Sequence, residues 1–118
     1  MSNKDVLIFI EHILESIKDI SAFILKTSKK EFSENKEKLN AVVRSLEIIG
    51  EAVKNLPISF REKYQEIPWK KISGLRDIII HQYSDIDLDV IWDTIQKDIP
   101  VLEKQIKKIK ERLIKGGN

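Results

Sequence analysis

Apolar residues recur at helical spacing along nearly the whole chain. Between residues 6 and 24, steps of four and three residues alternate through Val6, Ile10, Ile13, Ile17, Ile20 and Ile24. This spacing is typical of an amphipathic helix with one apolar stripe. Comparable stripes follow over about residues 34–55, 69–80 and 87–113, and no segment shows the alternation of a half-buried strand. The pattern predicts an all-α fold, an antiparallel, up-and-down four-helix bundle with one short extra helical turn.

Capping residues set the expected boundaries of the first two helices. Ser2 and Asp5 have the spacing of a capping box at the start of the first helix. The polar stretch Thr27 to Asn35 is expected to be a linker, with Ser33 as a candidate cap. The second helix is expected from about Glu34 to Asn55.

Prolines divide the rest of the chain. Pro57 ends the second helix and Pro68 begins the third, because proline disrupts the interior of a helix but is tolerated in its first turn. Residues 58–67 can therefore hold only a short helical turn, which Phe60 and Tyr64 would anchor. Pro100 lies inside the last apolar stripe, which predicts a kink or a break near residues 97–99.

Length and composition limit the class of protein. The 118 residues suffice for one domain, residues 1–118, with one core. The absence of cysteine excludes disulfides, thiolate zinc sites and cysteine nucleophiles. No apolar run approaches the roughly 20 residues that span a bilayer, and the polar start does not resemble a signal peptide. We therefore expect a cytoplasmic protein with no membrane association.

Charge is unevenly distributed although the net charge is only +2. Residues 84–98 contain five aspartates and one lysine, whereas residues 103–115 contain six basic residues and two glutamates. The basic segment has two interpretations. It is a solvated face favoured near a helix C-terminus, or it is a patch that contacts phosphates.

Three reactive side chains lie at the end of the apolar run of residues 72–80. They are Arg76, His81 and Tyr83, and a core does not need them beside three isoleucines. At 100° per residue, position 83 falls about 20° from position 76, whereas position 81 falls about 140° away. His81 reaches a site shared with Arg76 only if the helix ends or bends there, or if a second copy of the chain contributes.

The sequence around these residues resembles a known family. The R-x4-H-x-Y motif of residues 76–83 follows Arg44–Ala52 (RSLEIIGEA) and Ile67–Leu75 (IPWKKISGL), and precedes an acidic loop and a tryptophan helix at residues 87–98. In this order and spacing they resemble the HepT-like branch of the HEPN superfamily of helical toxin ribonucleases. The resemblance covers Leu39 to about Leu102.

The resemblance implies a function and its partners. It implies a metal-independent endoribonuclease without a cofactor, built as a homodimer whose cleft combines Arg76 and His81 from two copies. RNA would be cut to a 2′,3′-cyclic phosphate and a 5′-OH. The protein would be the toxin of a type VII (HEPN/MNT) toxin–antitoxin system, neutralised by a cognate MNT-type nucleotidyltransferase antitoxin that transfers AMP to Tyr83.

The residue types suit this chemistry on their own. Histidine transfers protons near neutral pH because its ordinary pKa is about 6.5. The arginine fork donates two parallel hydrogen bonds to a phosphate and keeps its charge. Tyr83 could donate to a phosphate oxygen or stack on a base. One chain offers one such histidine, and a two-fold dimer would offer two.

Several alternatives stay open. Arg44, Glu47 and Glu51 form either a ladder of exposed ion pairs or part of a catalytic cleft or dimer contact. Asp77 stands where many members of the family it resembles have asparagine, and its carboxylate could hold Arg76 in place or repel RNA. The motif could instead be a buried Arg–Asp pair with a hydrogen-bonded His81. The alternative function is a non-catalytic helical module that partners a nucleotidyltransferase or binds a nucleotide.

Other chemistries find little support. The glycines at 50, 74, 116 and 117 form no phosphate-binding loop. His12 is expected at the surface, and two distant histidines without cysteine do not indicate a transition-metal site. The D-x-D-x-D spacing of residues 85–89 lacks the glycine and glutamate of an EF-hand, so these aspartates are expected to cap a helix, with Asp87 as the N-cap.

Overall fold

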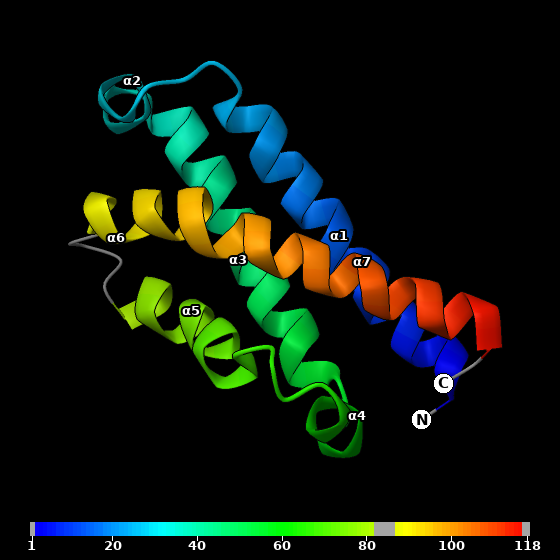
Figure 1. Cartoon of the computed structure of the whole chain (residues 1–118). Helices are drawn as coiled ribbons and strands as arrows, with labels where there is room; N and C mark the ends of the chain where they lie inside the picture. The colour runs from blue at the N-terminus through cyan, green and yellow to red at the C-terminus, as the bar shows by residue number, and fades with distance from the viewer. Residues whose placement is uncertain (1, 82–86, 117–118) are drawn as a thin grey trace.

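The computed structural model describes residues 2–81 and 87–116, and for residues 76–81 it describes the helical backbone alone. Four long helical segments form the molecule (Figure 1). They are α1 (Asn3–Ile24), α3 (Lys36–Asn55), α5 (Trp69–His81) and a last segment made of α6 (Leu88–Asp93), η1 (Thr94–Asp98) and α7 (Ile99–Gly116). Two short helices, α2 (Lys29–Glu34) and α4 (Ile58–Lys63), lie between them. The predicted all-α bundle is confirmed, and the described residues contain no strand.

The core is an aliphatic layer between these helices. α1 packs against α3 and α7, and α3 packs against α5. The stripe predicted from residue 6 to residue 20 is buried throughout, and Ile10, Ile13, Ile49 and Ile106 have no exposed surface. Burying one such side chain stabilises a fold by about 1.5–3 kcal/mol. The regular stripes therefore account for how α1, α3 and α7 meet.

The stretch after α1 is not the polar linker that the sequence predicted. Residues 29–34 form α2, whose N-cap is Ser28. The Ser28 hydroxyl accepts a hydrogen bond from the Glu31 amide at 3.1 Å, and the Glu31 carboxylate accepts one from the Ser28 amide at 3.4 Å. Phe32 is almost completely buried and its ring lies 5.3 Å from that of Trp92. The prediction failed because one apolar residue in a polar stretch gives no periodicity.

The start of α3 also differs slightly from the prediction. Asn35, and not Ser33, caps this helix, with its side-chain oxygen accepting a hydrogen bond from the Lys38 amide at 3.0 Å. The Ser33 hydroxyl instead donates to the Lys30 carbonyl within α2. The predicted end at Asn55 is confirmed.

The segment between the two prolines forms the predicted short turn. Pro57 is the N-cap of α4, and Phe60 and Tyr64 are buried beneath it, with ring centroids 5.1 Å apart. Trp69 opens α5, and its indole Nε1 donates to the carbonyl oxygens of Arg61 and Tyr64, both at 3.0 Å. This shared donor ties the first turn of α5 to α4.

Pro100 distorts the last helical segment without breaking it. A proline clashes with the carbonyl four residues earlier and lacks an amide hydrogen. Residues 94–98 form a π-helical turn, in which the Ile99 amide donates to the Thr94 carbonyl five residues back. The wider turn also suits the four-residue spacing of Ile91, Ile95 and Ile99, all of which stay buried. The irregularity expected near residues 97–99 is therefore a π-helical turn at residues 94–98 and not a break.

None of the helices in the described part of the chain combines the length and the apolar composition needed to cross a bilayer.

Candidate active site

α5 carries the motif residues on its last two turns. The helix runs to His81, so Arg76, Asp77 and His81 lie on its backbone, but their side chains fall outside the described residues, as does the whole of Tyr83. Because α5 stays helical through residue 81, positions 76 and 81 keep the separation of about 140° expected at 100° per residue. In one copy of the chain these two positions lie on different sides of α5.

The rest of the molecule holds α5 firmly. Ile72 is buried, and Leu75 packs partly buried against the core. The Lys71 ammonium lies 3.1 Å from the Asp98 carboxylate, which joins α5 to η1. The described side chains of α5, residues 69–75, therefore anchor the start of this helix to the core and to η1.

Arg44, Glu47 and Glu51 share the exposed side of α3. The Arg44 guanidinium lies 3.5 Å from the Glu47 carboxylate, an ion pair at i,i+3 as the ladder interpretation predicts. The same residues also line an open groove of about 300 Å³ between α1 and α3. The structure thus supports the predicted ion pair and also places these side chains around a shared hollow.

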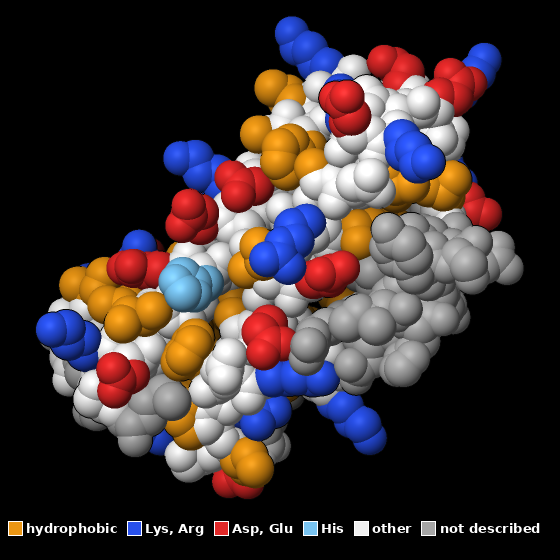
Figure 2. Space-filling view, turned by 180° about the vertical axis from the view of Figure 1, so that it is seen from behind, with side chains coloured by type: hydrophobic (Ala, Val, Ile, Leu, Met, Phe, Trp, Pro, Cys, Tyr) orange, Lys and Arg blue, Asp and Glu red, His pale blue; other side chains and the backbone are white. Residues whose placement is uncertain are grey.

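The α1–α3 groove contains a histidine that sequence reasoning set aside. His12 is exposed, as predicted, and lies edge-on to Phe9 with ring centroids 6.3 Å apart. It lines the groove together with Arg44, Glu47 and Glu51. Figure 2 shows a face on which acidic and basic side chains stand around the pale-blue histidine. Only the packing of α1 on α3 brings His12 to these charges, so spacing within one helix could not reveal it.

The acidic residues before α6 act as caps where the structure describes them. Asp87 accepts hydrogen bonds from the amides of Asp89 and Val90 at 3.0 and 3.2 Å, so the predicted N-cap is confirmed. Asp89 forms an ion pair with Lys29, which joins α6 to α2. The hydrogen bond from Lys29 to Asp89, together with the charge of that carboxylate, raises the pKa of Lys29 above its ordinary 10.5. Asp85 lies outside the described residues.

The basic face of α7 is partly occupied by the protein's own groups. Lys107 pairs with Glu103 at 3.7 Å, and Lys110 approaches Glu11 of α1 at 3.9 Å. The Arg112 guanidinium lies 5.7 Å from the centre of the Tyr64 ring. These contacts favour a solvated helix face over a patch reserved for phosphates. No group of three potential metal ligands occurs among the residues that the structure describes.

Comparison with known proteins places the chain in a family. The family model described as "Ribonuclease HepT-like" matches residues 13–109. A Caldanaerobacter subterraneus protein named "Putative RNase" is 47% identical over 104 residues, covering 88% of this chain and 93% of that relative. "Probable ribonuclease HepT" of Thermococcus cleftensis is 39% identical over 110 residues, covering 93% of this chain and 97% of that relative.

A further relative is longer than this chain. A Methanocaldococcus jannaschii protein named "Gamma-glutamylcyclotransferase and putative RNase" is 48% identical over 115 residues. The match covers 98% of this chain but 52% of that relative, so the chain spans about half of its length. No solved structure matches the chain.

Proposed function

The chain belongs to the HepT-like ribonuclease family, and on this premise we propose that it is a toxin that cuts RNA without a metal ion. The family match over residues 13–109 carries the proposal, since it includes the whole of α5 with its R-x4-H sequence. The names of the relatives, which include RNase or ribonuclease, support the same activity.

His81 and Arg76 would share the chemistry. A histidine near neutral pH removes the proton from a ribose 2′-OH, whose oxygen attacks the adjacent phosphorus. The arginine fork stabilises the charge that builds on the phosphate oxygens. The bond to the 5′ oxygen then breaks, a protonated histidine supplies its proton, and the products are a 2′,3′-cyclic phosphate and a 5′-OH.

A homodimer would supply both proton-transfer groups. One histidine cannot act as base and acid within a single cleavage step, whereas a two-fold cleft presents two. The separation of positions 76 and 81 around α5 supports this assembly, because an arginine of one copy can then meet the histidine of the other. Asp77, Arg44, Glu47 and Glu51 remain candidates for the walls of that cleft.

Control would come from a partner acting on Tyr83. A nucleotidyltransferase would join its hydroxyl to the α-phosphate of ATP, releasing pyrophosphate and leaving AMP on the tyrosine. The added anion would compete with RNA for Arg76, and the purine would block the cleft. Incubation with the cognate transferase, ATP and magnesium should add AMP mass to the peptide containing Tyr83. Tyr83→Phe should remain unmodified.

Cleavage by the purified protein is the decisive test. Wild type should cut RNA in EDTA, and His81→Ala and Arg76→Ala should each lose about 10²–10⁴-fold in rate while keeping the helical circular-dichroism signal. His12→Ala removes the other histidine of the chain and should leave the rate unchanged. If His12→Ala loses cleavage while His81→Ala and Arg76→Ala keep it, the catalytic site lies in the α1–α3 groove. A wild type that binds its partner but never cuts RNA would indicate the non-catalytic binding module.

A further inference from the structure

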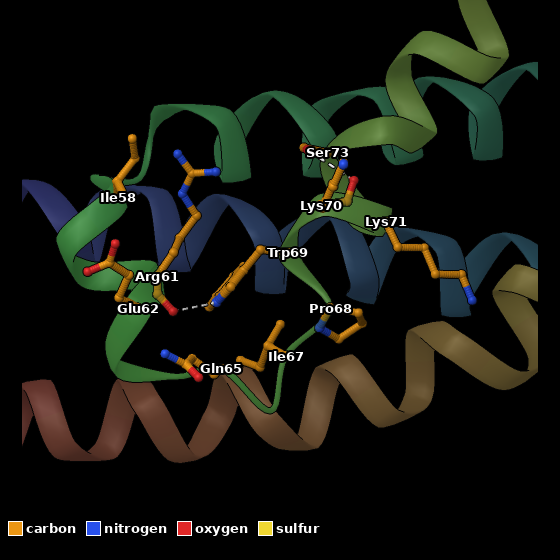
Figure 3. Close-up of a pocket in the computed structure, with 10 residues that line it drawn as sticks. All are labelled: Ile58, Arg61, Glu62, Gln65, Ile67, Pro68, Trp69, Lys70, Lys71 and Ser73. Atoms are coloured by element: carbon orange, nitrogen blue, oxygen red, sulfur yellow. Dashed lines mark hydrogen bonds between the residues drawn. The ribbon is translucent and has the colours of Figure 1, made fainter.

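A second open groove lies at the other end of α5, between α4 and the first turns of α5. We call it the α4–α5 groove; its volume is about 860 Å³. Figure 3 shows its lining, with the Trp69 indole between the Arg61 and Pro68 side chains. Apolar side chains form much of its wall, and basic side chains stand at its edge: Ile58, Ile67, Pro68 and Trp69, and then Arg61, Lys70 and Lys71.

Two of the cations in this groove lack partners in the described part of the chain. The Arg61 Nε atom is buried and has no hydrogen-bond acceptor there. A buried donor without an acceptor costs about 1–3 kcal/mol, so the Arg61 side chain would gain from an acceptor such as a water molecule or an anion. Lys70 is exposed and forms no ion pair with a described residue, whereas Lys71 is held by Asp98. Glu62 is the one acidic side chain in the lining, so the groove suits an anion.

Gly74 lies on α5 between this groove and the motif, and the described residues leave open space around it. A Cβ placed on Gly74 would meet no described atom within 4 Å. A glycine inside a helix costs roughly 1 kcal/mol relative to alanine, and packing against described residues does not require one here. By register, positions 70, 74, 77 and 81 fall within about 60° of one another on α5. The groove and His81 are thus joined along one side of a single helix.

We propose that the α4–α5 groove holds a phosphate of the RNA strand that flanks the cleavage site, with Arg61 and Lys70 as its ligands. The apolar wall would carry the adjoining base or sugar, as in other single-strand sites that combine cations with apolar and aromatic surfaces. Positions 70 and 81 lie about 17 Å apart along the helix axis at 1.5 Å per residue. That span corresponds to about five stacked nucleotides at 3.4 Å each.

This inference rests on the proposed ribonuclease function. An acidic protein segment would also satisfy Arg61 and Lys70, but nothing in such a partner would need the side of α5 on which positions 70, 74 and 81 share a register. An RNA strand needs both, because its phosphates continue from the groove to the reacting bond. Charge complementarity and this continuity therefore favour RNA.

The test measures binding of a fluorescent 2′-O-methyl oligonucleotide, which lacks the attacking hydroxyl, to the full chain by anisotropy. Lys70→Gln and Arg61→Gln should each weaken binding about tenfold at low salt, the effect of losing one charge-assisted contact. The slope of log Kd against log salt should fall by about 0.7 per lost phosphate contact. Lys108→Gln makes the same charge change at an exposed α7 position and should bind like wild type.

A length series sharpens the result. Wild-type affinity should rise as the oligonucleotide grows from about four to about eight nucleotides, and reach a plateau once it spans from His81 to the groove. Lys70→Gln should lose that rise and bind the shortest oligonucleotide as wild type does. Lys70 is exposed, so this variant keeps the test valid even if Arg61→Gln fails to fold.

Two results would overturn the inference. In one, Lys70→Gln and Lys108→Gln bind all lengths equally well while wild type still cuts RNA; the groove then has no part in RNA binding and the proposed function survives. In the other, the groove variants keep RNA binding but lose binding to the antitoxin protein, and the groove is a protein-docking surface. If wild type neither binds nor cuts RNA, the proposed function itself fails.

Discussion

Replacing Trp69 by phenylalanine tests how α5 is anchored. The change removes the indole N–H that donates to the carbonyls of Arg61 and Tyr64. Both carbonyls keep another partner, because they also accept from the Tyr64 and Ile67 amides at 3.2 and 3.1 Å. The hydrogen-bond loss should therefore lie near the usual 1 kcal/mol rather than the larger cost of a buried orphan.

Packing adds a second loss at the same position. Trp69 is only 8% exposed and its ring lies 6.5 Å from that of Phe60. The smaller phenyl ring leaves part of this space unfilled, which costs about 1 kcal/mol more. We therefore expect Trp69→Phe to lower the free energy of unfolding by about 2 kcal/mol.

Trp92→Phe provides the matched control. Trp92 is half-buried against Phe32, and its indole has no hydrogen-bond acceptor among the described residues. The same chemical change there should cost less than about 1 kcal/mol. Urea titrations followed by far-UV circular dichroism give both values. Equal losses in the two variants, or a loss below about 0.5 kcal/mol for Trp69→Phe, would refute the argument that the shared indole donor anchors α5.

Three further predictions concern local stability and titration. Gly74→Ala should raise the free energy of unfolding by about 0.5–1 kcal/mol, seen as a higher Tm, because a methyl group meets no described atom there; destabilisation would reveal an unrecognised close contact. Ser28→Ala should lower it by about 1 kcal/mol through loss of the cap on the Glu31 amide, and an unchanged urea midpoint would mean that α2 contributes little. Asp89→Asn should lower the pKa of Lys29, which the carboxylate holds above 10.5, as followed by NMR of its side chain. Since that pKa is raised in the folded chain, the ion pair favours folding below about pH 10.5 and loses its effect as pH rises through the folded value.

The predictions from the sequence agree with the structure for features that depend on the residues of a single helix. The burial of Ile10 and Ile13, the cap at Asp87 and the start of α5 after Pro68 follow from periodicity and backbone chemistry within a few residues. The R-x4-H-x-Y motif could likewise be recognised without a structure, because its residue types and their spacing indicated phosphate chemistry. The family comparison confirms the resemblance drawn from that motif.

What the sequence missed depends on contacts between segments. α2 is held in place because Phe32 is buried against Trp92, sixty positions further along the chain. A distortion at Pro100 could be predicted from the sequence. That it takes the form of a π turn and not a break depends on the packing of Ile95 and Ile99 in the core.

The surroundings of the candidate site were also decided by tertiary packing. Arg44 and Glu47 could be paired from their spacing, yet only the contact of α1 with α3 brings His12 beside them. The α4–α5 groove likewise arises where a proline-bounded turn docks against a helix start. The sequence by itself determined the helices and the reactive residues, because these depend on neighbours along the chain. Which of those residues share a surface was decided by the fold, because that depends on neighbours in space.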